Sequence, residues 1–448
     1  MTPNGPSPDV YARRRARLLE RLDRAVVFLP PVTEAVYAHD VHYPYRQDTN
    51  IRYLCGFEEP AALILSRSGA QEDGFVLCVR PRDEEAAVWT GERAGIEGAR
   101  QTYGADHAFP IDQTFEVLER CLKKAEVLWY GYPADAAVRA RLLETVHRAN
   151  AGRQREGRPR IVLREAEELL GELRWRKDPE EIALMRQAAA ITVAAHRALL
   201  EEVRPGDTEH RVAARIEYLL RRGGCSGPAY GTIAAGGSAA TILHYVRNNQ
   251  VLREGDLLLI DAGGEFGGYA ADVTRTFPVG KSFSASQAEL YELVLAAQQA
   301  ALDTVRPGVT HEQVHKAAVA VLAEGMIRLG LLEGTPEECI ESESYKRFFM
   351  HGTSHWLGMD VHDAGEYRRG GTSRELEPGV VLTVEPGIYV AASAPAPERF
   401  RGIGIRIEDD VLVTDSGSEV LSADLPKERK EIEQIRTRAL ERPAAASG

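Results

Sequence analysis

The 448-residue chain has few cysteines and lacks a long apolar run, and both shortages limit what it can be. Its five cysteines are widely scattered and never spaced as a CxxC pair, which argues against a disulfide framework and against a thiolate zinc site. We therefore expect small core cysteines in a protein of a reducing compartment, most simply the cytoplasm. No apolar stretch approaches the length that spans a bilayer, so we expect no membrane partner.

Basic side chains are outnumbered in this sequence. The 55 lysines and arginines stand against 67 acidic residues, which gives a net charge of −12 and disfavours nucleic acid as a partner. The arginines from Arg13 to Arg17 are not followed by the apolar core of a secretory signal. We expect an exposed helix face over Val10 to Leu22 instead.

One common hydrolase signature is also missing. The sequence has no GxSxG motif, so Ser354 beside His355 is a weak candidate for a serine nucleophile. A hydrolase built on this chain needs a different set of catalytic groups.

The chain alternates strand-like and helical segments in its first third, which indicates a mixed α/β domain. We expect a helix over 115–125 and buried strands over 25–29, 62–65, 75–79 and 127–130. A boundary falls near Arg174 to Lys177, because Asp178 and Pro179 then offer an N-cap acid and a first-turn proline. The predicted domains are therefore 1–175 and 176–440, followed by a disordered tail over 441–448.

The second part of the chain contains an internal echo. Val203–Thr208 recurs as Val305–Thr310, each time at the end of a predicted long helix. Two apolar strands also share one pattern: each begins with a glycine, has an acid six residues after it, and has a second glycine two residues after the acid. The two series are Gly255, Asp261 and Gly263, and Gly379, Glu385 and Gly387. This order predicts two related halves about a pseudo-two-fold axis, with the two acids facing one cleft.

Four carboxylates in this part are flanked by apolar strand residues. Burying an unpaired anion costs several kcal/mol, so four such acids in one domain require a cation. With one histidine they supply enough donors for two divalent ions, and an oxygen-rich set favours Mn, and after it Co, Zn or Fe, over a thiophilic site. Two such ions lower the pKa of a bridging water and polarise a substrate carbonyl. The five candidate ligands are Asp261, Asp272, His355, Glu385 and Glu408.

The spacing of these residues gives two local expectations. Asp261 and Asp272 lie eleven residues apart with four glycines between them, so they can meet across a hairpin or a bulge. Arg406 and Glu408 lie two apart, so we expect them on the same face of one strand.

Six motifs around these residues closely resemble the bacterial aminopeptidase P family, the Xaa-Pro aminopeptidases among the pita-bread metallopeptidases. They are Ile242–Tyr245, Leu259–Gly263, Tyr269–Phe277, Phe349–His355, Val384–Gly387 and Gly402–Glu408. Tyr43–Gln47 extends the resemblance into the first domain, so it covers nearly the whole chain. It implies a mixed α/β domain followed by a pita-bread domain with duplicated halves.

The resemblance also implies a role for each motif residue. Two Mn²⁺ per subunit are expected, with Asp261 on one ion, His355 and Glu385 on the other, and Asp272 and Glu408 bridging both. Glu385 would also transfer the proton of the bridging hydroxide. The implied catalytic residues are Glu385, His355 and His362. The implied substrate-binding residues are His244, His351, His362, Tyr389 and Arg406.

The resemblance implies release of the first residue from peptides with proline in second place, and a homotetramer or homodimer through the N-terminal domain. A prolidase, which cuts only Xaa-Pro dipeptides, uses the same ligand set and stays open as the nearest alternative. Methionine aminopeptidase usually lacks so large an N-terminal domain, and creatinase-like enzymes lack an intact metal set. A non-catalytic peptide-binding relative would be expected to have lost ligands.

Overall fold

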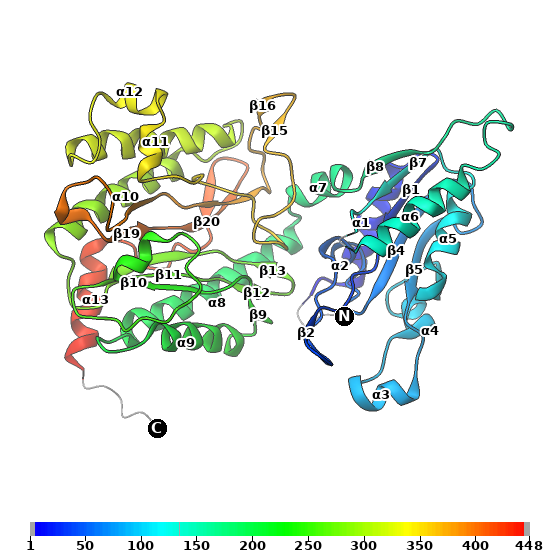
Figure 1. The fold of residues 1–448 in the computed structure, drawn as a ribbon, viewed down its shortest axis with the longest axis horizontal. Helices are drawn as coiled ribbons and strands as arrows, with labels where there is room; N and C mark the ends of the chain where they lie inside the picture. Colours follow the sequence, from blue (N-terminus) through cyan, green and yellow to red (C-terminus); the bar gives the residue numbers. More distant parts are fainter. Residues whose placement is uncertain (1–4, 134, 443–448) are drawn as a thin grey trace. The chain divides into compact units, whose positions relative to one another are not determined.

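The computed structural model describes residues 5–133 and 135–442, and the chain divides into two compact units, Met1–Leu173 and Arg174–Gly448. Figure 1 shows the elements of each unit. Among the described residues, every helix is too short or too polar to span a lipid bilayer. All five cysteines are free and buried, which confirms the expectation of small core residues.

The first unit is built on a six-stranded sheet in the order β6-β5-β4-β1-β7-β8. Val26 and Phe28 of β1 pack in one core with α5 and α6. All five residues of the strand are buried, which explains why it reads as a continuous apolar run. The predicted helix over 115–125 is α5, which ends three residues early, at Leu122. The strands are β1 (Ala25–Leu29), β4 (Ala61–Arg67), β5 (Gly74–Val79), β6 (His107–Pro110), β7 (Val127–Tyr130) and β8 (Val162–Glu165), and the longer helices are α1 (Pro8–Glu20), α5 (Thr114–Leu122) and α6 (Ala136–Ala149).

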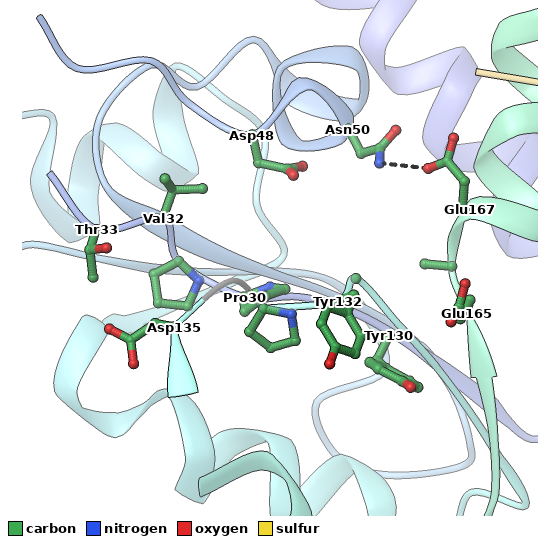
Figure 2. Close-up of a pocket in the computed structure, with 14 residues that line it drawn as sticks. Pro30, Val32, Thr33, Asp48, Asn50, Tyr130, Tyr132, Asp135, Glu165 and Glu167 are labelled. Atoms are coloured by element: carbon green, nitrogen blue, oxygen red, sulfur yellow. Dashed lines mark hydrogen bonds between the residues drawn. The ribbon is translucent and has the colours of Figure 1, made fainter. Parts of the chain in front are cut away.

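A pocket of about 380 Å³ opens where three strands of this sheet end (Figure 2). Because β1, β7 and β8 run parallel, their carboxyl ends lie at one edge of the sheet. Asp48 caps the short helix α2 (Thr49–Cys55) and Asp135 caps α6 through backbone N–H groups. Glu167 accepts a hydrogen bond from Asn50 at 3.4 Å. Three acids of this pocket therefore take part in local structure.

The second unit contains two helix pairs, α8 with α9 and α10 with α11, whose members pack against each other (Figure 1). The segment between the members of each pair is the repeated Val-Arg-Pro-Gly sequence. Gly255 and Gly379, which precede the two equivalent strands, share a left-handed backbone with φ of +93° and +89°. The repeat in the sequence thus corresponds to a repeat in backbone conformation. The four helices are α8 (Pro179–Glu202), α9 (Glu209–Arg222), α10 (Ala285–Thr304) and α11 (His311–Arg328).

Short antiparallel sheets hold the segments of the second unit together. One has the order β10-β11-β14, another β17-β20-β21, and β18 pairs with β19. Their bounds are β10 (Ile233–Gly236), β11 (Leu257–Asp261), β12 (Gly264–Phe266), β13 (Tyr269–Ala270), β14 (Thr274–Pro278), β17 (Val381–Val384), β18 (Gly387–Val390), β19 (Ile403–Arg406), β20 (Asp409–Val413) and β21 (Ser418–Val420). The last helix is α13 (Arg429–Glu441), and the predicted tail lies from 443 onward outside the described residues.

Helix α8 begins as its sequence predicts. The Asp178 carboxylate accepts a hydrogen bond from the backbone N–H of Glu181, and the Glu181 carboxylate accepts one from the backbone N–H of Asp178. Pro179 takes the first helical position. This capping box satisfies backbone donors that would otherwise be orphaned. It fixes the residue at which α8 begins.

Candidate metal centre

Three acids of the predicted set meet at one end of β11. Asp261 is the last residue of that strand and stands opposite Thr274 of β14. Asp272 lies two residues before Thr274, in the link from β13, so the two aspartates do meet across an antiparallel pair. Glu408 forms an isolated bridge with Thr274, whose hydroxyl donates to its carboxylate at 2.6 Å. One residue of β14 thus aligns acids from three segments.

The second half contributes Glu385 and His355. Glu385 follows β17, and its backbone N–H bonds the carbonyl of Thr353 at 2.8 Å. Thr383 N–H bonds the carbonyl of His355 at 3.0 Å, and its hydroxyl accepts from the N–H of His355. The Nδ1 of His355 bonds the carbonyl of Trp356 at 3.1 Å, which leaves Nε2 available as a ligand.

The expectation that Arg406 and Glu408 share one strand is wrong. Arg406 ends β19, which pairs with β18, whereas β20 begins at Asp409 and pairs with β17. The chain changes partners at Ile407, where the sequence has neither glycine nor proline to signal a break. Both side chains still line the same pocket, because each belongs to a segment that passes one end of the site.

The structure brings the predicted ligands together to different degrees. Asp272, His355 and Glu408 each offer one ligand atom, and these atoms lie within 4.8 Å of one another. Glu385 lies beside them, with its carboxylate 3.5 Å from His355 Nε2. Asp261 instead pairs with the guanidinium of Arg406 at 2.5 Å. The donor set consists of carboxylate oxygens and one imidazole, which fits a divalent cation.

Without a metal, the pKa values of four of these groups are raised, so the site tends to hold protons. Burial raises the pKa of Asp261, and it raises that of Glu408 well above the ordinary value. Burial also raises the pKa of Glu385 to about 7. For His355, burial is outweighed by a hydrogen bond and charges from Asp272 and Glu385, which raise its pKa to about 9. A cation would replace these protons.

Metal binding should therefore release protons, and affinity should rise with pH. His355 holds a proton below about pH 9 and Glu385 below about pH 7, and both must lose it to become ligands. Titration calorimetry of metal-stripped protein with Mn²⁺, in buffers of different ionisation heat, measures this release. We expect tighter binding at pH 8 than at pH 6. Equal affinity without proton release across this range would contradict the assignment.

A pocket of about 490 Å³ opens onto these groups. The predicted substrate-binding residues His244, His351, His362 and Arg406 line it. Tyr389 connects two of them. Its hydroxyl accepts from Arg406 at 3.0 Å and bonds His351 Nε2 at 2.8 Å. Apolar side chains form another part of the wall, namely Ile233, Leu243, Val246 and Val361.

The two histidines closest to the ligands are held differently. His351 Nδ1 bonds the carbonyl of Gly352 at 2.7 Å, so both of its ring nitrogens have partners within the protein. The ring of His362 meets that of His355 edge to face, with 4.4 Å between centroids. Partial burial, and then the charge of His355, lower the pKa of His362.

Sequence reasoning missed Tyr230. Its hydroxyl, buried at the site, donates to Asp261 at 2.6 Å and contacts Asp272. Burial, and then the charges of those two carboxylates, raise the pKa of Tyr230 well above its ordinary value. The side chain therefore stays a neutral phenol and orients both carboxylates. No local signal identifies it, because a tyrosine before a glycine is common in loops.

Both parts of the chain match known families. Residues 183–415 match the model of metallopeptidase family M24, and residues 11–129 match that of the aminopeptidase P N-terminal domain. A Xaa-Pro aminopeptidase of Escherichia coli (strain K12) is 40% identical over 434 residues, covering 95% of this chain and 97% of that protein.

Solved structures show the same likeness. The Pseudomonas aeruginosa aminopeptidase PepP has a TM-score of 0.93 and 42% identity, covering 98% of this chain and 100% of its own. Aminopeptidase P from E. coli with the inhibitor Pro-Leu has a TM-score of 0.92 and 38% identity, with the same coverage. The likeness extends over both units.

Proposed function

Because the chain belongs to metallopeptidase family M24 and carries the aminopeptidase P N-terminal domain, we propose that it is a Xaa-Pro aminopeptidase. It would release the first residue from peptides with proline in second place. The observation that carries this proposal is the group Asp272, His355 and Glu408 at the base of a pocket lined by further histidines. The predicted mixed α/β fold with a C-terminal pita-bread domain is confirmed by the same families and structures.

The substrate bond explains why such a site is needed. The amide nitrogen of proline carries no N–H, so the bond cannot offer the donor that peptidases commonly recognise. We propose two Mn²⁺ per subunit, held by Asp261, Asp272, His355, Glu385 and Glu408. When bound, they would supply a hydroxide at neutral pH and polarise the scissile carbonyl. Co²⁺, Zn²⁺ or Fe²⁺ are alternatives for the same donors.

The chain's own residues then move the protons. We assign to Glu385, whose carboxylate lies 3.5 Å from His355 Nε2, the transfer of a proton from the attacking water to the proline nitrogen. We assign the contact with the developing oxyanion to His362, because His351 has both ring nitrogens engaged. The hydrogen bonds among His351, Tyr389 and Arg406 make one rigid wall for the substrate.

The N-terminal unit is proposed to serve assembly. We propose that residues 1–175 contact other subunits in a homotetramer or homodimer and that residues 176–440 carry catalysis. Exposed apolar residues on the first unit, including Tyr37 and Trp89, support an assembly role. Free buried cysteines suit a reducing cytoplasm.

Hydrolysis by metal-stripped protein, with and without Mn²⁺, tests the proposal. We expect alanine to be released from Ala-Pro-Ala only when the metal is present. Cleavage of the dipeptide Ala-Pro but not of the tripeptide would make the protein a prolidase. If loaded protein cuts neither peptide, the substrate class is wrong.

A further inference from the structure

The segment Arg174–Lys177 contacts the loop that carries His362, although the sequence pattern marks it only as a boundary. Lys177 Nζ donates to Asp363 Oδ2 at 2.9 Å, and Arg174 donates to Asp363 Oδ1 at 2.5 Å. The side chains of Lys177 and Asp363 are each 1% exposed, and that of Arg174 is 4% exposed. Asp363 directly follows His362, so this buried pairing fixes the backbone next to the histidine.

Trp175 holds the same loop on another side. Its ring meets that of Trp356 edge to face at 5.8 Å, and the Arg374 guanidinium lies 3.2 Å above it. Gly365 passes so close that a Cβ there would stand 2.8 Å from the Trp175 ring. A Cβ at Gly358 would stand 2.1 Å from Asp363 Oδ2, so the loop also closes tightly around the ion pair.

This loop needs such anchors, because residues 357–367 form neither helix nor strand. Backbone hydrogen bonds tie the loop at Leu357, Gly358 and Asp363, but no continuous ladder runs through 357–367, so side-chain contacts also fix its position. A buried ion pair is a poor device for stability alone, since apolar side chains of similar size often stabilise a fold equally well. What a buried pair with fixed hydrogen bonds does supply is one defined geometry.

The geometry at stake is that of His362. The side chain is exposed toward the pocket, with its ring beside that of the ligand His355. We propose that Lys177, together with Arg174, is a positioning residue for His362, acting through Asp363. The inference rests on the proposed Xaa-Pro aminopeptidase function. It adds a charged anchor, outside the set of metal ligands, on which the oxyanion contact depends.

The test variant is Lys177→Met, and Arg176→Met is its matched control. Arg176 lies in the same segment, but its side chain is 60% exposed and pairs with Glu377 at 3.3 Å on the surface. With Mn²⁺ and Ala-Pro-Ala, Lys177→Met should lower kcat about ten- to a hundredfold, the cost of slight misplacement of a catalytic group. Metal content should stay that of the wild type, because all five ligands are intact. Arg176→Met should change neither quantity.

A double-mutant cycle separates positioning from general damage. In a His362→Ala protein, adding Lys177→Met should cost no further activity, because the group that it positions is already gone. An equal loss in both backgrounds, or no loss in the wild-type background, would overturn the proposal. If Lys177→Met does not fold, Lys177→Gln, whose amide can still donate to Asp363, is carried through the same cycle under the same criteria.

Hydrogen exchange of the loop gives a readout that does not need turnover. Amides within 357–366 should exchange at least about tenfold faster in Lys177→Met than in Arg176→Met, because local opening there loses an anchor. Unchanged exchange would overturn the proposal. If loaded wild type cuts no proline peptide while this difference persists, the aminopeptidase function fails and the anchoring of the loop stands.

Discussion

Replacing Asp272 by alanine is expected to abolish both divalent-metal binding and hydrolysis while the chain stays folded. Asp272 supplies one of the three clustered ligand atoms and also pairs with His355 at 3.3 Å. Its loss should lower metal affinity and activity by more than the roughly 10- to 100-fold that follows from removing a residue that only supports a ligand. The backbone N–H of residue 272, which bonds Asp410, remains in place, so the local chain path should survive.

The matched control is Asp424→Ala, which removes an exposed carboxylate from a turn of the same unit. Metal content by plasma mass spectrometry, melting temperature and release of alanine from Ala-Pro-Ala are measured for both variants. Asp424→Ala should behave as the wild type. Turnover retained by Asp272→Ala would overturn the bridging role of this carboxylate.

Replacing Glu385 by glutamine is expected to lower kcat by about 10²- to 10⁴-fold, the usual contribution of a positioned general acid and base. The amide keeps the size of the side chain but cannot accept the proton of the attacking water. The exposed Glu431→Gln change on α13 is the control and should have no effect.

The wild-type pH profile checks the same role. Burial gives Glu385 a raised pKa, about 7 without metal, and a protonated carboxyl cannot act as the base. The rate should therefore fall as the pH drops through the pKa of this group, which bound cations will shift downward. A flat acid limb in the wild type, or near-normal kcat in Glu385→Gln, would exclude Glu385 as the proton-transfer group.

Local patterns predicted much of the second unit. Buried acids within apolar strands indicated a cation site without any structure, because an unpaired buried anion is too costly to be incidental. The repeated glycines also have the same backbone conformation, since Gly255 and Gly379 both adopt positive φ before equivalent strands. These features are visible in sequence because each depends on residues within one short segment.

The sequence by itself determined the fold class and the family, and it predicted a set of metal donors, since apolar periodicity, glycine positions and acid placement are properties of neighbouring residues. Only the tertiary structure decided how separate segments meet. In the structure, the strands before and after Ile407 pair with different partners. The structure also places the Tyr230 hydroxyl in contact with two aspartates. It also set Lys177 against Asp363, which lies 186 residues away along the chain. Such contacts follow from packing and charge burial between distant elements, and no local pattern records them.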